Sequence, residues 1–101
     1  MEIDEIVAFA LSLPDTEECF PFGPDNVVLK TKGKMFLILF LATEPIWMNY
    51  KASPEDILEQ REIYHEYVFP GYHWNTLHIN KQMQTVIIQK MIQTSYNLVR
   101  K

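Results

Sequence analysis

The sequence is poor in cysteine and glycine and has no long apolar run, and several common functions depend on these features. It has one cysteine, Cys19, so an internal disulfide is excluded and a reducing compartment is favoured. Its three glycines are scattered at 23, 33 and 71, which excludes a glycine-rich phosphate loop. No apolar run approaches the roughly 20 residues of a membrane span. The N-terminus carries acids where a secretory signal carries Lys or Arg, so we expect a cytoplasmic protein with no membrane partner.

Residues for catalysis or metal binding are equally sparse. Cys19 stands beside Glu17 and Glu18, without the electropositive surroundings of a catalytic thiol. His73 and His78 are five positions apart, so a regular strand would point them to opposite faces. No C-x-x-C or H-E-x-x-H spacing occurs. The sequence therefore predicts no enzymatic activity, no cofactor and no metal site.

Charge is distributed unevenly along a chain whose net charge is −4. Residues 1–25 hold seven acids and no Lys or Arg, and residues 52–66 hold five acids and one base. Residues 26–51 hold four lysines and one acid, and residues 67–101 hold four bases and no acid. Strong non-specific nucleic-acid binding needs many phosphate contacts from Lys and Arg. A basic face is therefore possible only in residues 26–51 and 67–101.

The central stretch, residues 27–51, predicts three consecutive strands. Met35 to Leu41 is an unbroken apolar run between turn signals, which is typical of a strand covered on both faces. The preceding residues from Val27 to Lys32 begin apolar and end alternating with lysine, as an edge strand would. Gly33 supplies the first turn. In the third strand, Trp47, Asn49 and Lys51 share one face.

Helical patterns flank this meander. Apolar spacing predicts a helix from Ile3 to Leu13, and Ser53-Pro54 begins a second helix that ends near residues 62–65. Residues 73–79 have strand composition, with one or two short strands in this region, and a last helix runs from Asn80 to about Leu98. The order α-β-β-β-α-β(β)-α predicts one α+β domain over residues 1–101, with a single antiparallel sheet and flanking helices.

Several side chains are expected to pack inward. Residues 15–25 are interpreted as a loop from which Phe20 and Phe22 fold back onto the sheet. Ile57, Leu58 and Tyr64 are expected to face the core from the second helix. In the last helix the predicted apolar stripe consists of Met83, Val86, Ile87, Met91, Thr94 and Leu98, widened by Ile88, Ile92, Tyr96 and Val99.

The region around Trp74 is the candidate binding surface. If Leu77 and Ile79 face the core, then Trp74, Thr76 and His78 face away from it. Such a tryptophan either covers one end of the sheet or contacts a ligand, and large aromatics are usually buried. Lysines of the first hairpin would either contact a ligand or protect an edge strand from aggregation. The candidate nucleic-acid-binding residues are Lys30, Lys32, Lys34, Lys51, His73, Trp74, Asn75 and Thr76.

An ordered set of short motifs resembles the MmcQ/YjbR family over nearly the whole chain. The set comprises Leu-Ser-Leu-Pro at 11–14, Glu-Glu before Phe-Pro-Phe-Gly-Pro at 20–24, Gly-Lys-Met-Phe at 33–36, Ser-Pro-Glu-Asp at 53–56, Gln-Arg-Glu at 60–62, Pro-Gly-Tyr-His at 70–73, Trp-Asn-Thr at 74–76, and Ser-Tyr-Asn-Leu-Val at 95–99.

This resemblance implies an α+β fold like the secretion-chaperone or frataxin-like architectures. It also implies a cytoplasmic bacterial protein of a kind commonly labelled DNA-binding, in which two β-hairpins are proposed to act as wings, here residues 30–34 and 70–76. Family members usually carry an N-K-x-H insert before Trp-Asn-Thr, whereas here Tyr72-His73 runs directly into Trp74. The second wing is therefore expected to be shorter and to lack that lysine.

Two functions lead as hypotheses for a monomeric protein without enzymatic activity, ahead of a distant third, an enzyme that uses an unrecognised pocket. In the first, Lys30, Lys32, Lys34 and Lys51 contact DNA phosphates while residues 73–76 contact bases or sugars. In the second, a protein partner binds the exposed sheet face or an edge strand, as a chaperone-like module would allow. The salt dependence of binding distinguishes the two hypotheses, because phosphate contacts weaken steeply as the salt concentration rises.

Overall fold

The structure, a computed structural model, describes residues 1–63, 68–70, 74–79 and 83–100. Within these residues the chain forms three helices and six strands, which confirms the predicted α+β class. The helices are α1 (Ile3–Leu11), α2 (Pro54–Ile63) and α3 (Thr85–Arg100). The strands are β1 (Thr16–Cys19), β2 (Asn26–Thr31), β3 (Lys34–Phe40), β4 (Trp47–Tyr50), β5 (Val68–Pro70) and β6 (Asn75–His78).

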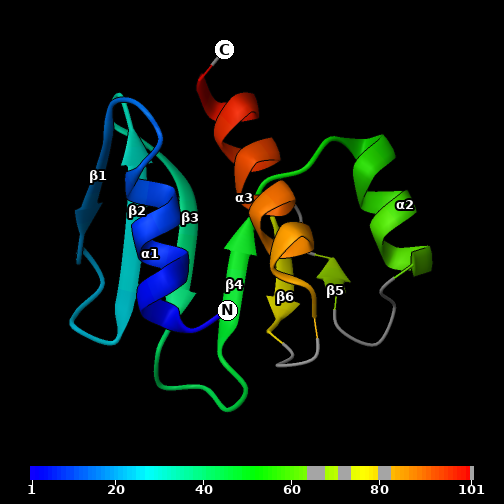
Figure 1. The fold of residues 1–101 in the computed structure, drawn as a ribbon, viewed down its shortest axis with the longest axis horizontal. Helices are drawn as coiled ribbons and strands as arrows, with labels where there is room; N and C mark the ends of the chain where they lie inside the picture. The colour runs from blue at the N-terminus through cyan, green and yellow to red at the C-terminus, as the bar shows by residue number, and fades with distance from the viewer. Residues whose placement is uncertain (64–67, 71–73, 80–82, 101) are drawn as a thin grey trace.

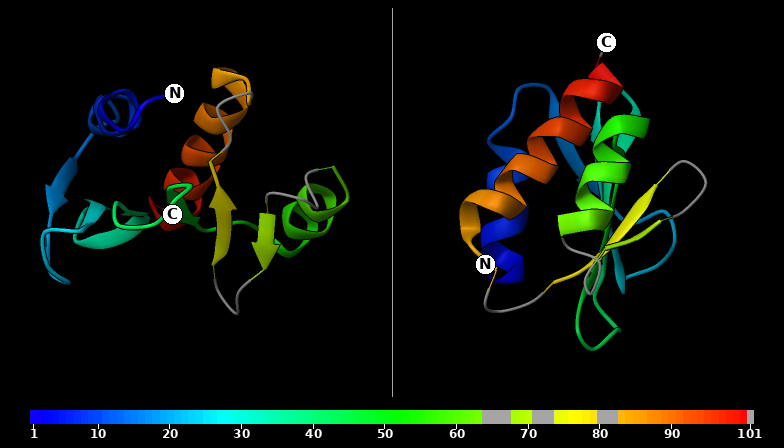
Figure 2. Two further views of the ribbon diagram at one scale, coloured as in Figure 1. Left: turned by 90° about the horizontal axis from the view of Figure 1, so that it is seen from below. Right: turned by 90° about the vertical axis from the view of Figure 1, so that its right-hand side faces the viewer.

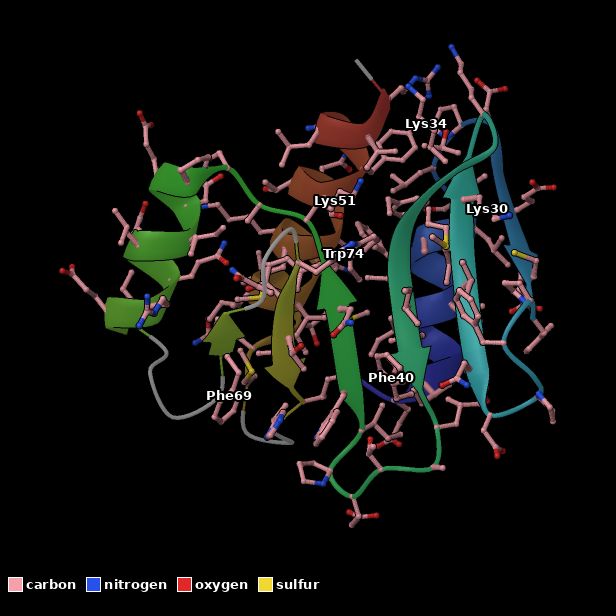
Figure 3. All side chains as sticks on the ribbon, turned by 180° about the vertical axis from the view of Figure 1, so that it is seen from behind. Lys30, Lys34, Phe40, Lys51, Phe69 and Trp74 are labelled. Carbon is pink, nitrogen blue, oxygen red and sulfur yellow. The ribbon has the colours of Figure 1, made fainter. Side chains whose placement is uncertain are left out.

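All six strands form one antiparallel sheet in the order β1-β2-β3-β4-β6-β5 (Figure 1). The predicted meander is β2, β3 and β4, and the second short strand before the last helix is present as β5. Helices α1 and α3 lie on one face of the sheet, whereas α2 lies beside the β5 edge (Figures 1 and 2). The opposite face has no helix over it in the described part of the chain (Figure 3).

The prediction that the middle strand β3 is the most buried is wrong, because four of its seven residues are buried against four of six in β2. The predicted cover on both faces is also incomplete, since the described helices cover only one face of the strand (Figure 3). Phe36, Leu37 and Leu39 are fully buried in the core that α1 and α3 share with the sheet. The pairing with β2 shifts between Leu29 and Lys30, so that Phe36 is an extra, bulged residue beside Leu37. Because the bulge changes the alternation, both neighbouring side chains enter the same core.

The end of α1 is fastened to the end of α3. Pro14 follows α1, and its carbonyl oxygen accepts a hydrogen bond of 2.7 Å from the Tyr96 hydroxyl group. Arg100 donates to the same carbonyl and forms an ion pair of 3.1 Å with Asp15. These contacts hold the chain where it enters β1.

The predicted loop over residues 15–25 is wrong in its first half. Residues 16–19 form β1, which pairs with β2 through Glu17 opposite Lys30 and Cys19 opposite Val28. β1 carries no apolar alternation from which it could be predicted, and its addition means that β2 is not an edge strand. Phe20 and Phe22 do not fold back onto the sheet, since 47% and 59% of their surfaces are exposed.

Helix α2 packs loosely. It has no buried residue, and Leu58, predicted to face inward, is 64% exposed. Ile57 is half-buried, whereas Tyr64 lies outside the described residues. A helix beside a sheet edge, rather than over a sheet face, has little apolar surface to cover it.

Helix α3 begins at Thr85, and the predicted start at Asn80 lies outside the described residues. Val86, placed in the predicted stripe, is 63% exposed. The buried residues of the helix are Ile88, Met91, Ile92, Ser95, Tyr96 and Val99. Four of them, Ile88, Ile92, Tyr96 and Val99, are the residues predicted only to widen the stripe, so the buried face is rotated toward them. Among the described helices, none combines the length and the hydrophobicity that crossing a membrane requires.

Candidate nucleic-acid interface

Both hairpins that the family resemblance implies as wings close at the same end of the sheet. Strands β2, β4 and β5 run in one direction and β3 and β6 in the other, because every neighbouring pair is antiparallel. The β2–β3 hairpin therefore ends at Thr31 opposite Lys34, on the same side as the β5–β6 pair of Pro70 and Asn75. We call this the hairpin end of the sheet.

The lysines of the first hairpin spread around its tip. Lys30 pairs with Met35 on the uncovered face, whereas Lys34 pairs with Thr31, whose side chain is buried on the helix side. The prediction that Lys30 and Lys32 share one face of a strand is wrong, because β2 ends at Thr31. Lys32 belongs to the turn, where φ is 51°, followed by Gly33 with φ 79°. The three side chains therefore surround the tip instead of lining one face.

Lys51 and Trp74 meet at the hairpin end on the uncovered face (Figure 3). Lys51 follows β4 and Trp74 precedes β6, and the Lys51 ammonium nitrogen lies 5.1 Å from the centre of the Trp74 ring. This is cation–π geometry, which leaves the ammonium group with its remaining donors free for an anion. The backbone nitrogen of Lys51 donates 2.8 Å to the buried Ser95 hydroxyl group, which fixes the position of the lysine.

The residues after Trp74 divide between the two faces. Thr76 lies on the uncovered face and donates a hydrogen bond of 2.7 Å to the side-chain oxygen of Asn49 on β4. Asn75 points the other way and is fully buried, so its predicted role as a ligand contact is wrong for its side chain. His73 and the tip of the second wing lie outside the described residues.

Acidic groups reduce the positive charge near the first hairpin. Glu17 on β1 is directly opposite Lys30, and opposite charges in such cross-strand pairs attract. Asp15 is paired with Arg100. Lys32, Lys34 and Lys51 have no acid as their strand partner and form no ion pair within the described residues. These three lysines are the groups best placed to contact phosphates.

A second group of aromatic side chains, not selected from the sequence, lies on the uncovered face away from the hairpin end. We call it the aromatic row: Phe40, Trp47, His78 and Phe69, one from each of β3, β4, β6 and β5. Phe40 is opposite Trp47, and Trp47 is opposite His78, in the strand pairing. The signal was present in the sequence, because Trp47 precedes buried Met48 and His78 follows buried Leu77. It becomes a row only when the strand order is known.

Nothing in the described part of the chain groups side chains for metal binding or thiol chemistry. No set of three or more His, Cys, Asp or Glu side chains there is arranged to hold a metal ion. Cys19 is half-buried on β1, and its sulfur lies 3.6 Å from the carbonyl oxygen of Val28. His78 belongs to the aromatic row, and His65 and His73 lie outside the described residues.

Comparison with known proteins places this arrangement in a family. The chain is 33% identical over 95 residues to the uncharacterized protein YbdF of Escherichia coli, a match that covers 89% of this chain and 77% of that protein. The crystal structure of Deinococcus radiodurans protein DR2400, with domain DUF419, superposes with a TM-score of 0.89 at 26% identity, covering 98% of this chain and 78% of that one.

A crystal structure of a Pseudomonas syringae protein has the same fold at 21% identity. Its TM-score is 0.81, and the match covers 99% of this chain and all of that one (100%). The sequence pattern of the YjbR family matches residues 11–98, which include all six strands and nearly all of α3. The protein therefore belongs to the YjbR family.

Proposed function

We propose that this protein is a non-enzymatic DNA-binding protein that contacts the phosphate backbone with the hairpin end of its sheet. The observation that carries the proposal is that Lys32 and Lys34 of the β2–β3 hairpin and Lys51, directly after β4, all lie at that end of the sheet. Phosphate contacts of this kind position a protein on DNA without reading sequence. The net charge of −4 limits the affinity, so we expect micromolar binding at low salt.

The arrangement of the hairpins supports this proposal. Lys32 lies in a tight two-residue turn with Gly33, and Lys34 begins the strand that follows it, so the backbone of both lysines is carried on a rigid tip. Lys51 is held over Trp74, and its backbone is bonded to Ser95. The Lys51 ammonium group, held in this way, loses less conformational entropy on binding than a mobile one does. A small number of contacts can then give measurable affinity.

A protein partner that adds a strand to the sheet is less well supported. The sheet has two edge strands. One is β1, a four-residue strand with exposed Glu17 and Glu18, and the other is β5, a three-residue strand that ends in Pro70. Short edges with charges or proline are the devices that prevent strand addition. Helix α2 also packs beside β5 (Figure 1). If a protein partner exists, the uncovered face is the better surface for it.

The proposal is tested by fluorescence anisotropy with a labelled DNA duplex at about 50 and 200 mM salt. With about three phosphate contacts, the association constant should fall roughly 40-fold over that range. The double variant Lys34→Glu/Lys51→Glu should weaken binding and make its salt dependence shallower. Lys90→Glu is the matched control, because Lys90 is exposed on α3 at the helix-covered face.

Two results would overturn the proposal. One is the absence of binding at tens of micromolar protein in low salt. The other is binding that Lys90→Glu weakens as much as the double variant does, since the hairpin end would then have no special role.

A further inference from the structure

The most exposed apolar side chains of the uncovered face lie in one place. Val28 and Ile38 also point to this face, but they are only 0% and 9% exposed. In the aromatic row, by contrast, Trp47 is 39% and Phe69 is 43% exposed, on either side of His78. The exposure of this face is therefore concentrated in side chains of the row, which extends across β3, β4, β6 and β5.

The rings of the row are packed against one another and so are held in place. The Trp47 and His78 rings are stacked with centres 4.9 Å apart and planes only 2° from parallel. The Phe69 ring lies 4.2 Å from His78 on the other side, and Phe40 meets Trp47 edge to face at 6.5 Å. Such contacts fix ring orientations before any ligand arrives. Preorganised aromatic surface of this kind binds flat, apolar groups at low entropic cost.

Charge on the same face favours a polyanion over a neutral partner. From β3 to β5, the described strand positions on this face include no acid, while Lys51 lies at the hairpin end over Trp74. Lys51, directly after β4, is four residues beyond Trp47, about 13 Å along the strand direction. The hydrogen-bonded pair of Asn49 and Thr76 lies between them. An aromatic surface and a cation are thus joined along one continuous path.

Nucleic acid offers both matching groups only when its bases are unpaired. A duplex buries the faces of its bases in the stack and presents phosphates, so it would leave the aromatic row without contacts. An unpaired strand offers base faces to aromatic side chains together with its phosphates, and each stacked base contributes measurably to affinity. The face is also wide and uncovered, so a strand can lie across it without helix movement (Figure 3).

We propose that the uncovered face binds single-stranded DNA, with unpaired bases against Trp47 and Phe69 and a backbone phosphate at Lys51. This inference rests on the proposed DNA-binding function and deepens it, because it names the form of DNA that the protein prefers. The hairpin lysines give general phosphate affinity, and the aromatic row discriminates single strands from duplexes.

The test compares a labelled single strand with the duplex of the same sequence, using anisotropy at low salt. The wild-type protein should bind the single strand more tightly. Trp47→Ala and Phe69→Ala should each weaken single-strand binding roughly 5- to 100-fold while changing duplex binding less than about 2-fold. Phe22→Ala is the matched control, since Phe22 is 59% exposed but lies outside the row. Circular dichroism establishes that each variant is folded.

A spectroscopic arm does not depend on truncating the row. The chain has two tryptophans, so Trp74→Phe leaves Trp47 as the single tryptophan. Its fluorescence should be quenched by the single strand and unaffected by the duplex. Equal affinity for both forms, or unchanged single-strand binding in both Trp47→Ala and Phe69→Ala, would overturn the inference. If the inference fails in this way, duplex binding that depends on Lys34 would still support the proposed function. If the wild-type protein binds neither form of DNA, both the inference and the proposed function are wrong.

Discussion

The buried hydroxyl group of Ser95 donates a hydrogen bond of 2.5 Å to the carbonyl oxygen of Phe36, the bulged residue of β3. The same hydroxyl oxygen accepts 2.8 Å from the backbone nitrogen of Lys51. One side chain of α3 thus satisfies a backbone acceptor on one strand and a backbone donor at the end of the next. It links the core bulge to the lysine that we propose for DNA contact.

Ser95→Ala should lower the free energy of unfolding by about 1–3 kcal/mol, because it leaves a buried backbone acceptor and a partly buried backbone donor without their partner. Urea denaturation measures the change. Ser12→Ala is the control, since the Ser12 hydroxyl bonds to the Phe9 carbonyl in an exposed position, and should cost less than about 0.5 kcal/mol. Equal costs for both variants would contradict the linking role of Ser95.

Asn75→Leu should stabilise the protein by about 1–2 kcal/mol. Asn75 is fully buried, and neither polar atom of its side chain has a hydrogen-bond partner among the described residues. A leucine of similar size removes the cost of burying an amide and packs beside Tyr50, its neighbour in the strand pairing. Thermal or urea unfolding gives the answer, and a destabilised variant would show that the amide is bonded in solution.

Lys32→Asn should leave the fold as stable as the wild type, or more stable by up to about 0.5 kcal/mol. Positive φ at both Lys32 and Gly33 is the type I′ arrangement, and Asn-Gly is the sequence that this turn prefers. The same variant removes one proposed phosphate contact, so duplex affinity should fall and the salt slope should drop by about one. Chemical denaturation and anisotropy on one sample separate the two effects, and reduced stability would contradict the turn argument.

Tyr96→Phe should cost about 1 kcal/mol of unfolding free energy, because it removes the bond from the Tyr96 hydroxyl to the Pro14 carbonyl. The ring itself remains packed edge to face on Phe36, so no cavity forms. Asp15→Asn should cost less, since the ion pair of Asp15 with Arg100 is exposed to solvent and asparagine tolerates the φ of 59°. The reverse order in urea unfolding would show that the ion pair, not the hydroxyl, fastens α1 to α3.

The sequence alone determined the class of fold and most of its elements. An apolar run bounded by turn signals predicted β3, glycine after lysine predicted the β2–β3 turn, and serine followed by proline predicted the start of α2. These signals are local, since periodicity and turn chemistry act within a few residues. For the same reason the alternation from Trp74 to Leu77 correctly assigned Thr76 and His78 to the face away from the core.

Only the tertiary structure decided which strands are neighbours, and with that the candidate site. β1 has no apolar pattern and forms because β2 offers it a partner, while Phe20 and Phe22 stay exposed beyond it. The burial of Asn75 depends on what covers the helix side of β6, which no local pattern records. The aromatic row comes from four strands separated by up to 38 positions in the chain. Long-range pairing brings those rings together, because hydrogen bonding between strands depends on sheet order and not on distance along the sequence.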